Sequence, residues 1–340
     1  MEVNKKIRVL VVDDSILFRE VLSKGISSDF NIDVVAVAAD PYDASEKIMK
    51  YKPDVMTCDV EMPKMNGIEF VRKLMPQYPM PIIVVSNVSG VVFDAMNAGA
   101  VDFVAKPDLK SVNNVEKFIN ELIIKIKIAA NAKIIRCKGN DAPGIESRAE
   151  RFKDHLIAIG ASTGGTEAIH KIIKSLPSNI PGIVIVQHIP PDFSRMFAER
   201  LNNSTKLEVR EAKTGDYTEV GSVLIAPGDQ HMKIKKIGDR YRVECFHGEK
   251  VNGHCPSVDV LFESVAKEAG NRALGLILTG MGYDGAKGLL AMRRKGARTI
   301  GQDEASSVVY GMPKVAYNIG AVEKQVPLEY IAAGICNLLK

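Results

Sequence analysis

The sequence of 340 residues lacks the long apolar segments that membrane proteins carry. None of its apolar runs approaches the ~18 to 20 residues that a membrane-spanning helix needs. Near the N-terminus the apolar stretch Ile7–Val12 has only six residues, and two aspartates follow it, so this segment is too short for a signal peptide. We therefore expect a cytoplasmic protein that does not insert directly into a membrane.

Closely paired cysteines and a basic block are also missing. The 45 basic and 41 acidic residues leave a formal net charge of +4, spread along the chain without a long basic stretch, and no helix-turn-helix pattern is present. We expect no nucleic-acid partner. The cysteines lack the close spacing of zinc or redox motifs, which predicts reduced thiols. They are Cys58, Cys137, Cys245, Cys255 and Cys336.

The length favours two domains, since one domain usually takes about 100 to 200 residues. Up to about Ala130, short apolar runs alternate with helix-length amphipathic segments, a pattern typical of a parallel sheet with crossover helices. The runs are rich in β-branched residues, as strands buried on both faces should be. They cover Ile7 to Val12, Val34 to Ala38, Asp54 to Cys58, Ile82 to Val85 and Asp102 to Ala105.

The alternation of apolar runs and amphipathic segments stops in the segment 131–153, where Gly, Pro, Asn and charged residues gather. We interpret this segment as a linker. A second alternating series follows and again predicts a doubly wound, mostly parallel sheet. Tyr241 to Phe246 follows the polar patch Lys233 to Arg240 and is interpreted as half of a β-hairpin. The other runs cover Leu156 to Ile159, Ile183 to Val186, Ser222 to Ala226, Leu274 to Leu278 and Thr299 to Ile300.

Acidic side chains stand at strand ends in the first domain. Asp13 and Asp14 follow the first predicted strand, and Asp59 follows the third. Because doubly wound sheets bind ligands at this carboxyl edge, the three carboxylates should meet there and attract a divalent cation, most plausibly Mg²⁺. Asp14 taken alone could equally cap the helix that starts near Ser15. Ser86 and Lys106 follow the fourth and fifth strands and add a hydroxyl and an ammonium group to the same rim.

The strings VLVVDDS, DVEMPKMNGIEF, IIVVSN and GAVDFVAKP give the first 125 residues a resemblance to receiver domains of two-component signalling. The resemblance implies a flavodoxin-like (βα)5 domain over residues 1–130 and a histidine kinase as phosphoryl donor. Asp59 would accept the phosphoryl group, while Asp13, Asp14 and Asp59 would hold Mg²⁺. Ser86 would move toward the phosphoryl group, and Lys106 would pair with its charge. Metal and ammonium would neutralise the charge of the transferring group, the main requirement of phosphoryl transfer.

The second domain contains a serine in a glycine-rich turn. The run Leu156 to Ile159 leads directly into GASTGG, which holds Ser162 and precedes a helix-like stretch. This is the G-x-S-x-G form, in which glycines let the backbone bend sharply and expose the hydroxyl. The following helix N-terminus offers amides to an anion. Such a turn can also cradle a nucleotide phosphate, so that alternative stays open.

A serine hydroxyl needs a base within hydrogen-bond reach to act as a nucleophile. His188 follows the buried run Ile183 to Val186 and Gln187, at the next strand end after Ser162. Asp284 follows a later strand among glycines that permit close backbone approach. A structural histidine and an aspartate in an ordinary turn are the alternatives. The order Ser, His, Asp differs from the usual serine-hydrolase orders, which argues for a separate fold with convergent geometry.

Six strings carry a second resemblance, in order: IGASTGG, VQHIPPDFSRMFAERL, APGDQHM, PSVDVLFESVA, LTGMGYDGAKGL and QDEASSVVYGMP. They are closely similar to the chemotaxis protein-glutamate methylesterases (CheB type) over nearly all of residues 155–335. The resemblance implies a Rossmann-like α/β esterase domain over residues 154–340, with no cofactor of its own. Its substrate would be a glutamate methyl ester on the cytoplasmic domain of a chemoreceptor, and some members also deamidate receptor glutamines.

The same resemblance implies site roles. Ser162 would attack the ester carbonyl, His188 would take its proton, and Asp284 would orient the imidazole. Backbone amides near Met281 and Gly282, or at the serine turn around Thr163, would stabilise the oxyanion, typically by a few kcal/mol per donor. Arg195 and Arg200 are candidates for contact with an acidic receptor surface. Cys255 stands where arginine is expected, which changes a possible substrate contact, and Thr166 stands where proline is expected.

The simplest hypothesis for the fusion is that the unphosphorylated receiver blocks the esterase site and that phosphorylation of Asp59 favours an open arrangement. Two other functions remain open. A response regulator can have a second domain that only binds, either DNA or a protein partner, and a serine-dependent amidase is the nearest enzymatic rival. Methanol or ammonia release from the receptor distinguishes these possibilities.

Overall fold

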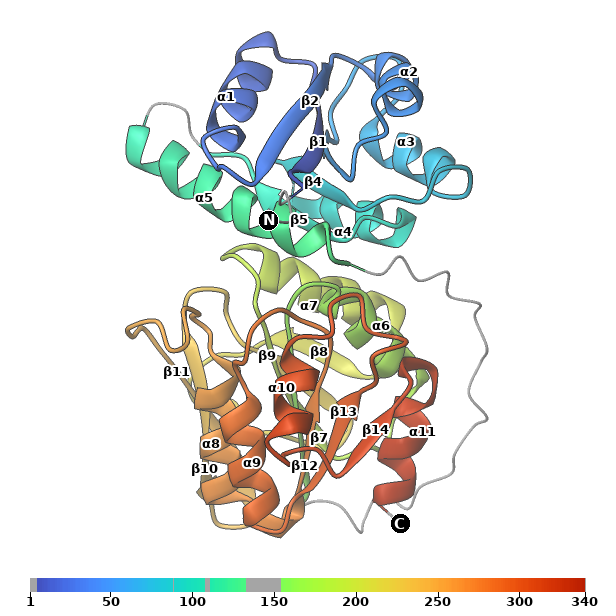
Figure 1. The fold of residues 1–340 in the computed structure, drawn as a ribbon. Helices are drawn as coiled ribbons and strands as arrows, with labels where there is room; N and C mark the ends of the chain where they lie inside the picture. The colour runs from blue at the N-terminus through green and yellow to red at the C-terminus, as the bar shows by residue number, and fades with distance from the viewer. Residues whose placement is uncertain (1–4, 88, 108–110, 133–153, 340) are drawn as a thin grey trace. The chain divides into compact units, whose positions relative to one another are not determined.

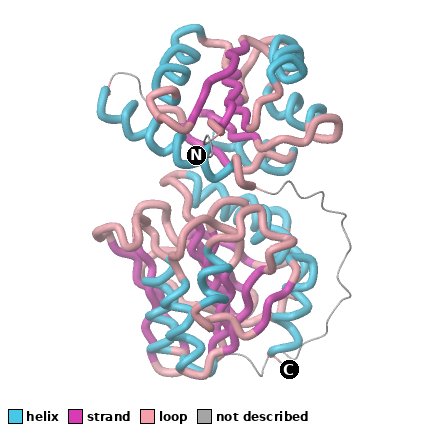
Figure 2. Tube along the Cα trace, in the orientation of Figure 1, coloured by secondary structure: helices cyan, strands magenta, loops and turns pink. Residues whose placement is uncertain are grey.

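The structure is a computed structural model that describes residues 5–87, 89–107, 111–132 and 154–339. The chain divides into two compact units, Met1–Ile134 and Ile135–Lys340, each described here by itself. Nearly all of the predicted linker, residues 133–153, lies outside the described residues. In both units helices flank a central sheet (Figure 2). None of the described helices combines the length and apolar composition needed to cross a membrane.

The first unit is a parallel sheet of five strands, as predicted, with helices around it (Figure 1). The strand order is β2-β1-β3-β4-β5. Helices cover both faces, and α1 packs on α5 through the rings of Phe18 and Phe118, whose centroids lie 5.8 Å apart. The strands are β1 (Ile7–Val12), β2 (Ile32–Ala38), β3 (Val55–Asp59), β4 (Ile82–Ser86) and β5 (Asp102–Ala105). The helices are α1 (Ile16–Ile26), α2 (Pro41–Tyr51), α3 (Gly67–Leu74), α4 (Ser89–Ala98) and α5 (Val112–Ala129).

Helix α1 shows how local sequence places the carboxylates of this unit. Ser15 is its N-cap, because the Ser15 hydroxyl accepts a hydrogen bond from the amide of Phe18 at 3.2 Å. The alternative in which Asp14 caps this helix is therefore wrong. Asp13 instead accepts from the amide of Ser15 at 2.9 Å, which leaves both aspartates on the turn between β1 and α1.

The second unit is a seven-stranded parallel sheet in the order β14-β13-β12-β6-β7-β9-β8, beside a separate hairpin of β10 and β11. Its strands are β6 (Leu156–Ala161), β7 (Gly182–Gln187), β8 (Glu208–Glu211), β9 (Ser222–Ile225), β10 (His231–Ile237), β11 (Arg240–Phe246), β12 (Ala273–Ile277), β13 (Arg298–Gln302) and β14 (Lys324–Val326). Its helices are α6 (Gly165–Ser175), α7 (Phe193–Ser204), α8 (Val258–Glu268), η2 (Gly270–Arg272), α9 (Ala286–Arg294), α10 (Met312–Asn318) and α11 (Leu328–Leu338).

The predicted hairpin is confirmed, and its first strand occupies most of the segment interpreted as a polar patch. In β10, Met232 and Ile234 are buried while Lys235 and Lys236 face outward, so the strand is half buried rather than a loop. The buried face packs on Val265 and neighbouring apolar residues of the core that contains α8. The hairpin thereby supports the helix whose N-terminus enters the candidate site.

Candidate functional site

The predicted carboxylates of the first unit lie together. Asp13 and Asp59 are almost fully buried, Asp14 is exposed, and one carboxylate oxygen of each lies within 4.8 Å of the others. The cluster stands between β1 and β3, where the strand order reverses, which is the usual ligand position of such a sheet. A compact set of carboxylate oxygens is the donor set that Mg²⁺ prefers.

Lys106 contacts this cluster. Its Nζ lies 2.8 Å from Asp13 Oδ2 and 2.6 Å from Asp59 Oδ2. Burial raises the pKa of Asp13, and the charge of Asp59 adds to this effect, while Lys106 opposes it. Burial alone would lower the pKa of Lys106, but its hydrogen bonds to Asp13 and Asp59 raise it on balance. Ser86 is buried at the end of β4, and its carbonyl accepts from the Lys106 amide at 3.2 Å.

In the second unit the predicted catalytic residues follow three adjacent strands. Strand β6 lies between β7 and β12, and the strand order reverses between β6 and β12. Ser162 follows β6 and His188 follows β7, and the His188 amide donates to the carbonyl of Ala161 at 3.1 Å. Because adjacent strands are separated by about 4.8 Å, Ser162 and His188 leave the sheet side by side.

The turn that bears Ser162 is tightly packed. The Ser162 amide donates to the carbonyl of Thr279 at 3.0 Å, just beyond β12. Gly164 adopts a left-handed conformation with φ of 76° directly before α6, which favours glycine. A Cβ on Gly280 would lie 2.6 Å from Ser162 Cβ, so only glycine fits there. The glycines of both motifs thus allow close approach of the two strand ends.

His188 and Asp284 are joined directly. His188 Nε2 lies 2.9 Å from Asp284 Oδ2, and the two side chains are only 8% and 1% exposed. His188 Nδ1 is buried and has no hydrogen-bond partner within the part of the chain that the structure describes. The Nε2 edge of the imidazole therefore faces the carboxylate, and the Nδ1 edge remains available for another group.

Asp284 receives five hydrogen bonds. Besides His188, the donors are Asn252 Nδ2 at 2.8 Å, Ser257 Oγ at 2.8 Å, and the amides of Val258 at 2.7 Å and Asp259 at 3.3 Å. Three of them belong to the N-terminus of α8, which favours negative charge. Burial alone would raise the pKa of Asp284, but these donors hold it well below its usual range. Asp284 is thus a charged acceptor at neutral pH.

The donors Asn252 and Ser257 were not among the predicted site residues. Both belong to the loop between β11 and α8, where the sequence carries neither a strand pattern nor a known catalytic spacing. Asn252 adopts a left-handed backbone with φ of 54° and also donates to Asp259 Oδ2 at 2.7 Å. A strained asparagine whose amide joins two carboxylates points to a role in the site, but the sequence alone does not reveal that strain.

The candidate oxyanion donors flank Ser162. Thr163 is buried beside it, and the Thr163 carbonyl accepts from Thr279 Oγ1 at 2.9 Å. Met281 is 51% exposed, and Gly282 follows it with φ of 88°. Both lie on the turn that joins the end of β12 to Asp284. These amides stay predictions as oxyanion donors.

Cys255 and the two arginines lie outside this hydrogen-bond network. Cys255 Sγ donates to the carbonyl of Asp229 at 3.3 Å. Arg200 is mostly buried and bonds Glu167 at 2.8 Å, whereas Arg195 is exposed. The described cysteines are free thiols, as predicted, and Cys137 lies outside the described residues.

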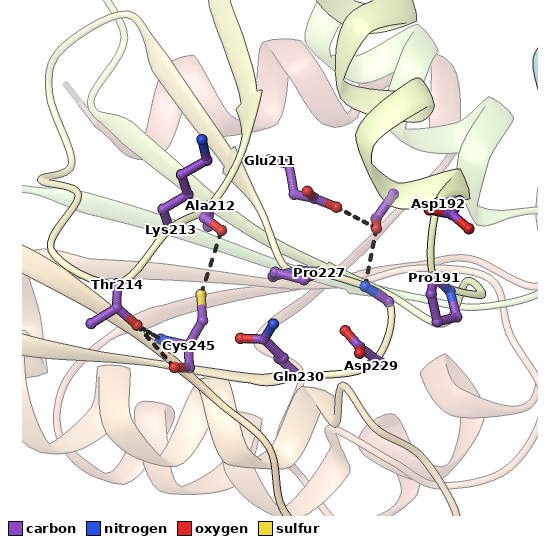
Figure 3. A pocket seen from close by; sticks show the side chains of 12 residues that line it. Pro191, Asp192, Glu211, Ala212, Lys213, Thr214, Pro227, Asp229, Gln230 and Cys245 are labelled. Atoms are coloured by element: carbon purple, nitrogen blue, oxygen red, sulfur yellow. Dashed lines mark hydrogen bonds between the residues drawn. The ribbon is translucent and has the colours of Figure 1, made fainter.

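A polar cavity of about 500 Å³ lies beyond the carboxyl ends of β8 and β9 (Figure 3). Glu211 accepts from Ser194 Oγ at 2.6 Å, and the Gly228 amide donates to that hydroxyl at 3.0 Å. Cys245 lines the opposite side. The lining contains none of the three predicted catalytic residues, so this cavity is separate from them.

Comparison with known proteins agrees with both units. A family model described as CheB methylesterase matches residues 157–335, and one described as response regulator receiver domain matches residues 9–115. A relative from Syntrophomonas wolfei, named protein-glutamate methylesterase/protein-glutamine glutaminase 2, is 58% identical over 335 residues and 98% of each chain. A Salmonella typhimurium relative named protein-glutamate methylesterase/protein-glutamine glutaminase is 47% identical over 96% of this chain and 95% of its own.

Among solved structures, the Thermotoga maritima CheB methylesterase catalytic domain is 36% identical with a TM-score of 0.53, covering 54% of this chain and 98% of that one. A receiver unit joined to a hydrolase-type α/β unit defines the chain as a response regulator with an enzymatic output domain. More narrowly, the chain belongs to the CheB methylesterase family. The predicted fold class and family membership are confirmed.

Proposed function

We propose that this chain is a phosphorylation-activated esterase that hydrolyses glutamate methyl esters on chemoreceptors to glutamate and methanol, and so provides adaptation in chemotaxis. The single observation that best supports this site is the hydrogen bond between His188 Nε2 and Asp284. Asp284 is charged and fully hydrogen-bonded, and His188 lies beside the turn that bears Ser162. The family match over residues 157–335 supports the reaction class.

Asp284 determines which imidazole nitrogen acts as the base. An ionised carboxylate can only accept hydrogen bonds, so His188 must donate its Nε2 proton to Asp284. Nδ1 then carries the free lone pair, and we propose that this atom accepts the proton of the Ser162 hydroxyl. The carboxylate holds the tautomer and stabilises the imidazolium that forms, as in other serine hydrolases.

The reaction then proceeds in two halves. Ser162 Oγ bonds to the ester carbonyl carbon while its proton passes to His188 Nδ1. Collapse of the tetrahedral intermediate breaks the bond to methoxide, which leaves as methanol with the Nδ1 proton. Water then attacks the acyl carbon and gives a proton to Nδ1. The bond to Ser162 Oγ breaks, Nδ1 returns that proton to Ser162, and the glutamate acid leaves and ionises. Amides at Thr163 or at Met281 and Gly282 would stabilise both oxyanions.

The same steps would deamidate a receptor glutamine, with ammonia as the leaving group. The relatives' names join the two activities, protein-glutamate methylesterase and protein-glutamine glutaminase. An amide needs a protonated leaving nitrogen, which the imidazolium at Nδ1 can supply. We expect both activities from one site, on receptor helices that the predicted cytoplasmic location would make accessible.

For the first unit, we propose that Asp59 accepts a phosphoryl group from a histidine kinase. Asp13, Asp14 and Asp59 would hold Mg²⁺, which supplies positive charge to the transferring group. Lys106, which contacts both buried aspartates, would add a second positive charge. Ser86 would close on the phosphoryl group. The compact oxygen cluster and the match to receiver domains support this assignment.

The proposal is tested by methanol release from methylated receptor membranes, using the full chain with a small acyl-phosphate donor and Mg²⁺. Wild type should release methanol, and Ser162→Ala should not. Equal release by both proteins would refute the catalytic role of Ser162. Ammonia release from receptors with glutamine at the same positions measures the second activity.

Regulation is tested with the same assay. Asp59→Asn should abolish the stimulation that the phosphoryl donor produces in wild type, because the acceptor carboxylate is gone. The ratio of rates with and without donor is the measured quantity. An unchanged ratio in Asp59→Asn would contradict activation through this residue.

A further inference from the structure

The ring of His254 lies flat on the ring of His188. The centroids are 3.7 Å apart and the planes differ by only 8°. His254 stands on the loop between β11 and α8, the same loop that supplies Asn252 and Ser257 to Asp284. This loop therefore contacts Asp284 through Asn252 and Ser257, and it contacts the face of the His188 ring through His254.

The stacking of His254 on His188 restrains a rotation of the His188 ring that the hydrogen bond to Asp284 leaves free. A single hydrogen bond from Nε2 to Asp284 fixes one point of the imidazole, and the ring can still turn about that bond. Such a rotation would change the direction of Nδ1, the atom to which we assign the Ser162 proton. A flat ring stacked at van der Waals distance restricts this rotation, because any tilt would bring the two rings into collision.

The loop is anchored firmly enough to act as a support. His231 on β10 donates from Nε2 to the Glu249 carbonyl at 2.8 Å and accepts from the Ser257 amide at 3.2 Å. Val251 and His254 exchange both backbone hydrogen bonds at 3.0 Å, which closes the tip of the loop. His254 is thus held by the backbone on one side and by the hairpin on the other.

The electrostatics agree with a supporting role. Burial and the neighbouring His188 lower the pKa of His254 to about 4, so His254 is uncharged at neutral pH. A neutral ring can lie against His188 even while His188 carries the serine proton. A charged ring at 3.7 Å would oppose that imidazolium.

We propose that His254 is a positioning residue for the esterase reaction, whose flat ring holds the plane of His188 so that Nδ1 stays directed at the serine turn. The inference rests on the proposed function, because it assigns His254 a role through His188. It concerns kcat, since ring orientation matters most during proton transfer, and the role that we assign to His254 involves no contact with the receptor.

The experiment compares His254→Phe with His254→Leu in the full chain. Both substitutions are apolar, but only phenylalanine presents a flat face. We expect kcat for methanol release to stay within about tenfold of wild type in His254→Phe and to fall about 100-fold in His254→Leu, with similar KM. His247→Leu, on the same loop with a side chain 73% exposed, is the matched control and should keep the wild-type kcat.

Labelling of Ser162 by a serine-directed organophosphonate gives a second readout that does not require the receptor. It should be slower in His254→Leu than in His254→Phe at equal thermal stability. Equal kcat and equal labelling in the two variants would overturn the inference. If wild type also failed to exceed Ser162→Ala, the proposed function itself would be refuted, which is a different outcome.

Discussion

In each unit an aspartate lies beside the reversal of strand order in a parallel sheet, but the pKa values of the two carboxyl groups are shifted in opposite directions. Asp13 lies near two other carboxylates, and burial with like charge raises its pKa. Asp284 is equally buried but accepts five hydrogen bonds, and its pKa is lowered. The same residue type is thus a proposed cation ligand in one unit and a hydrogen-bonded anion in the other.

The difference comes from what faces each carboxylate. In the receiver unit the charged groups that contact one another are three aspartates and one lysine, so the cluster keeps an excess of negative charge that a divalent cation can neutralise. In the esterase unit a helix N-terminus, an amide and a hydroxyl satisfy Asp284 without any cation. The strand order thus determines where the aspartate lies in each unit, and the neighbouring hydrogen-bond donors determine whether its charge is already satisfied.

The largest effect is expected from removing the charge of Asp284. Asp284→Asn keeps the shape but removes the negative charge and replaces one acceptor oxygen by an NH2 donor, so the side chain can no longer accept on both atoms and stabilise a charged His188. We expect kcat for methanol release to fall roughly 10⁴-fold, as when a triad carboxylate is neutralised elsewhere. A loss of less than tenfold in a folded protein would show that Asp284 does not orient the base.

A smaller effect is expected from the corresponding change in the receiver unit. Asp13→Asn removes one proposed ligand, so Mg²⁺ should no longer stabilise the protein. In wild type, Mg²⁺ at 100 times its Kd should add about 2.7 kcal/mol to the free energy of unfolding. Thermal unfolding with and without Mg²⁺ measures this difference. A shift of equal size in both proteins would exclude Asp13 as a ligand.

Ser257→Ala should have a more modest effect, because it removes one of the five donors to Asp284 and the N-cap of α8. We expect the free energy of unfolding to fall by about 1 kcal/mol. Ser175→Ala, whose hydroxyl bonds only within its own helix end among the described contacts, serves as the control. Urea unfolding compares the variants, and equal midpoints for wild type and Ser257→Ala would contradict the role of this cap.

The smallest effect concerns pH. The folded pKa of Asp284 is lowered below the unfolded value of about 3.9, so its stabilisation is present above that value and is lost as the pH falls through the folded pKa. The difference in free energy of unfolding between wild type and Asp284→Asn should therefore stay constant between about pH 5 and 8. Urea unfolding across this range checks it, and a difference that shrinks from pH 8 to pH 6 would contradict the assignment.

Most of the fold was predictable because buried parallel strands are apolar throughout. The runs around β1, β3, β4, β6, β7 and β12 stand out for that reason. Strands β8 (EVRE) and β14 (KQV) were missed, since each is a short edge strand that pairs with one neighbour and shows mostly polar residues. Most of strand β10 was taken for a polar patch because its three lysines outnumber its two buried apolar residues, Met232 and Ile234.

The candidate site was predictable only where residues follow strands. Ser162, His188 and Asp284 follow apolar runs, so topology brings them to one edge. Asn252 and His254 belong to a loop whose path depends on tertiary contacts such as the bonds of His231. No periodicity marks such residues, and their role emerges only from their contacts with Asp284 and His188.

The most direct test of the account is the protonation state of the His188 imidazole in the resting enzyme. Nitrogen-15 NMR of the histidine side chains, with His188 assigned by comparison with His188→Gln, reads which ring nitrogen carries the proton. We predict that the neutral imidazole carries its proton on Nε2, bonded to Asp284, and that Nδ1 is unprotonated. A proton on Nδ1, with Nε2 unprotonated, would contradict it.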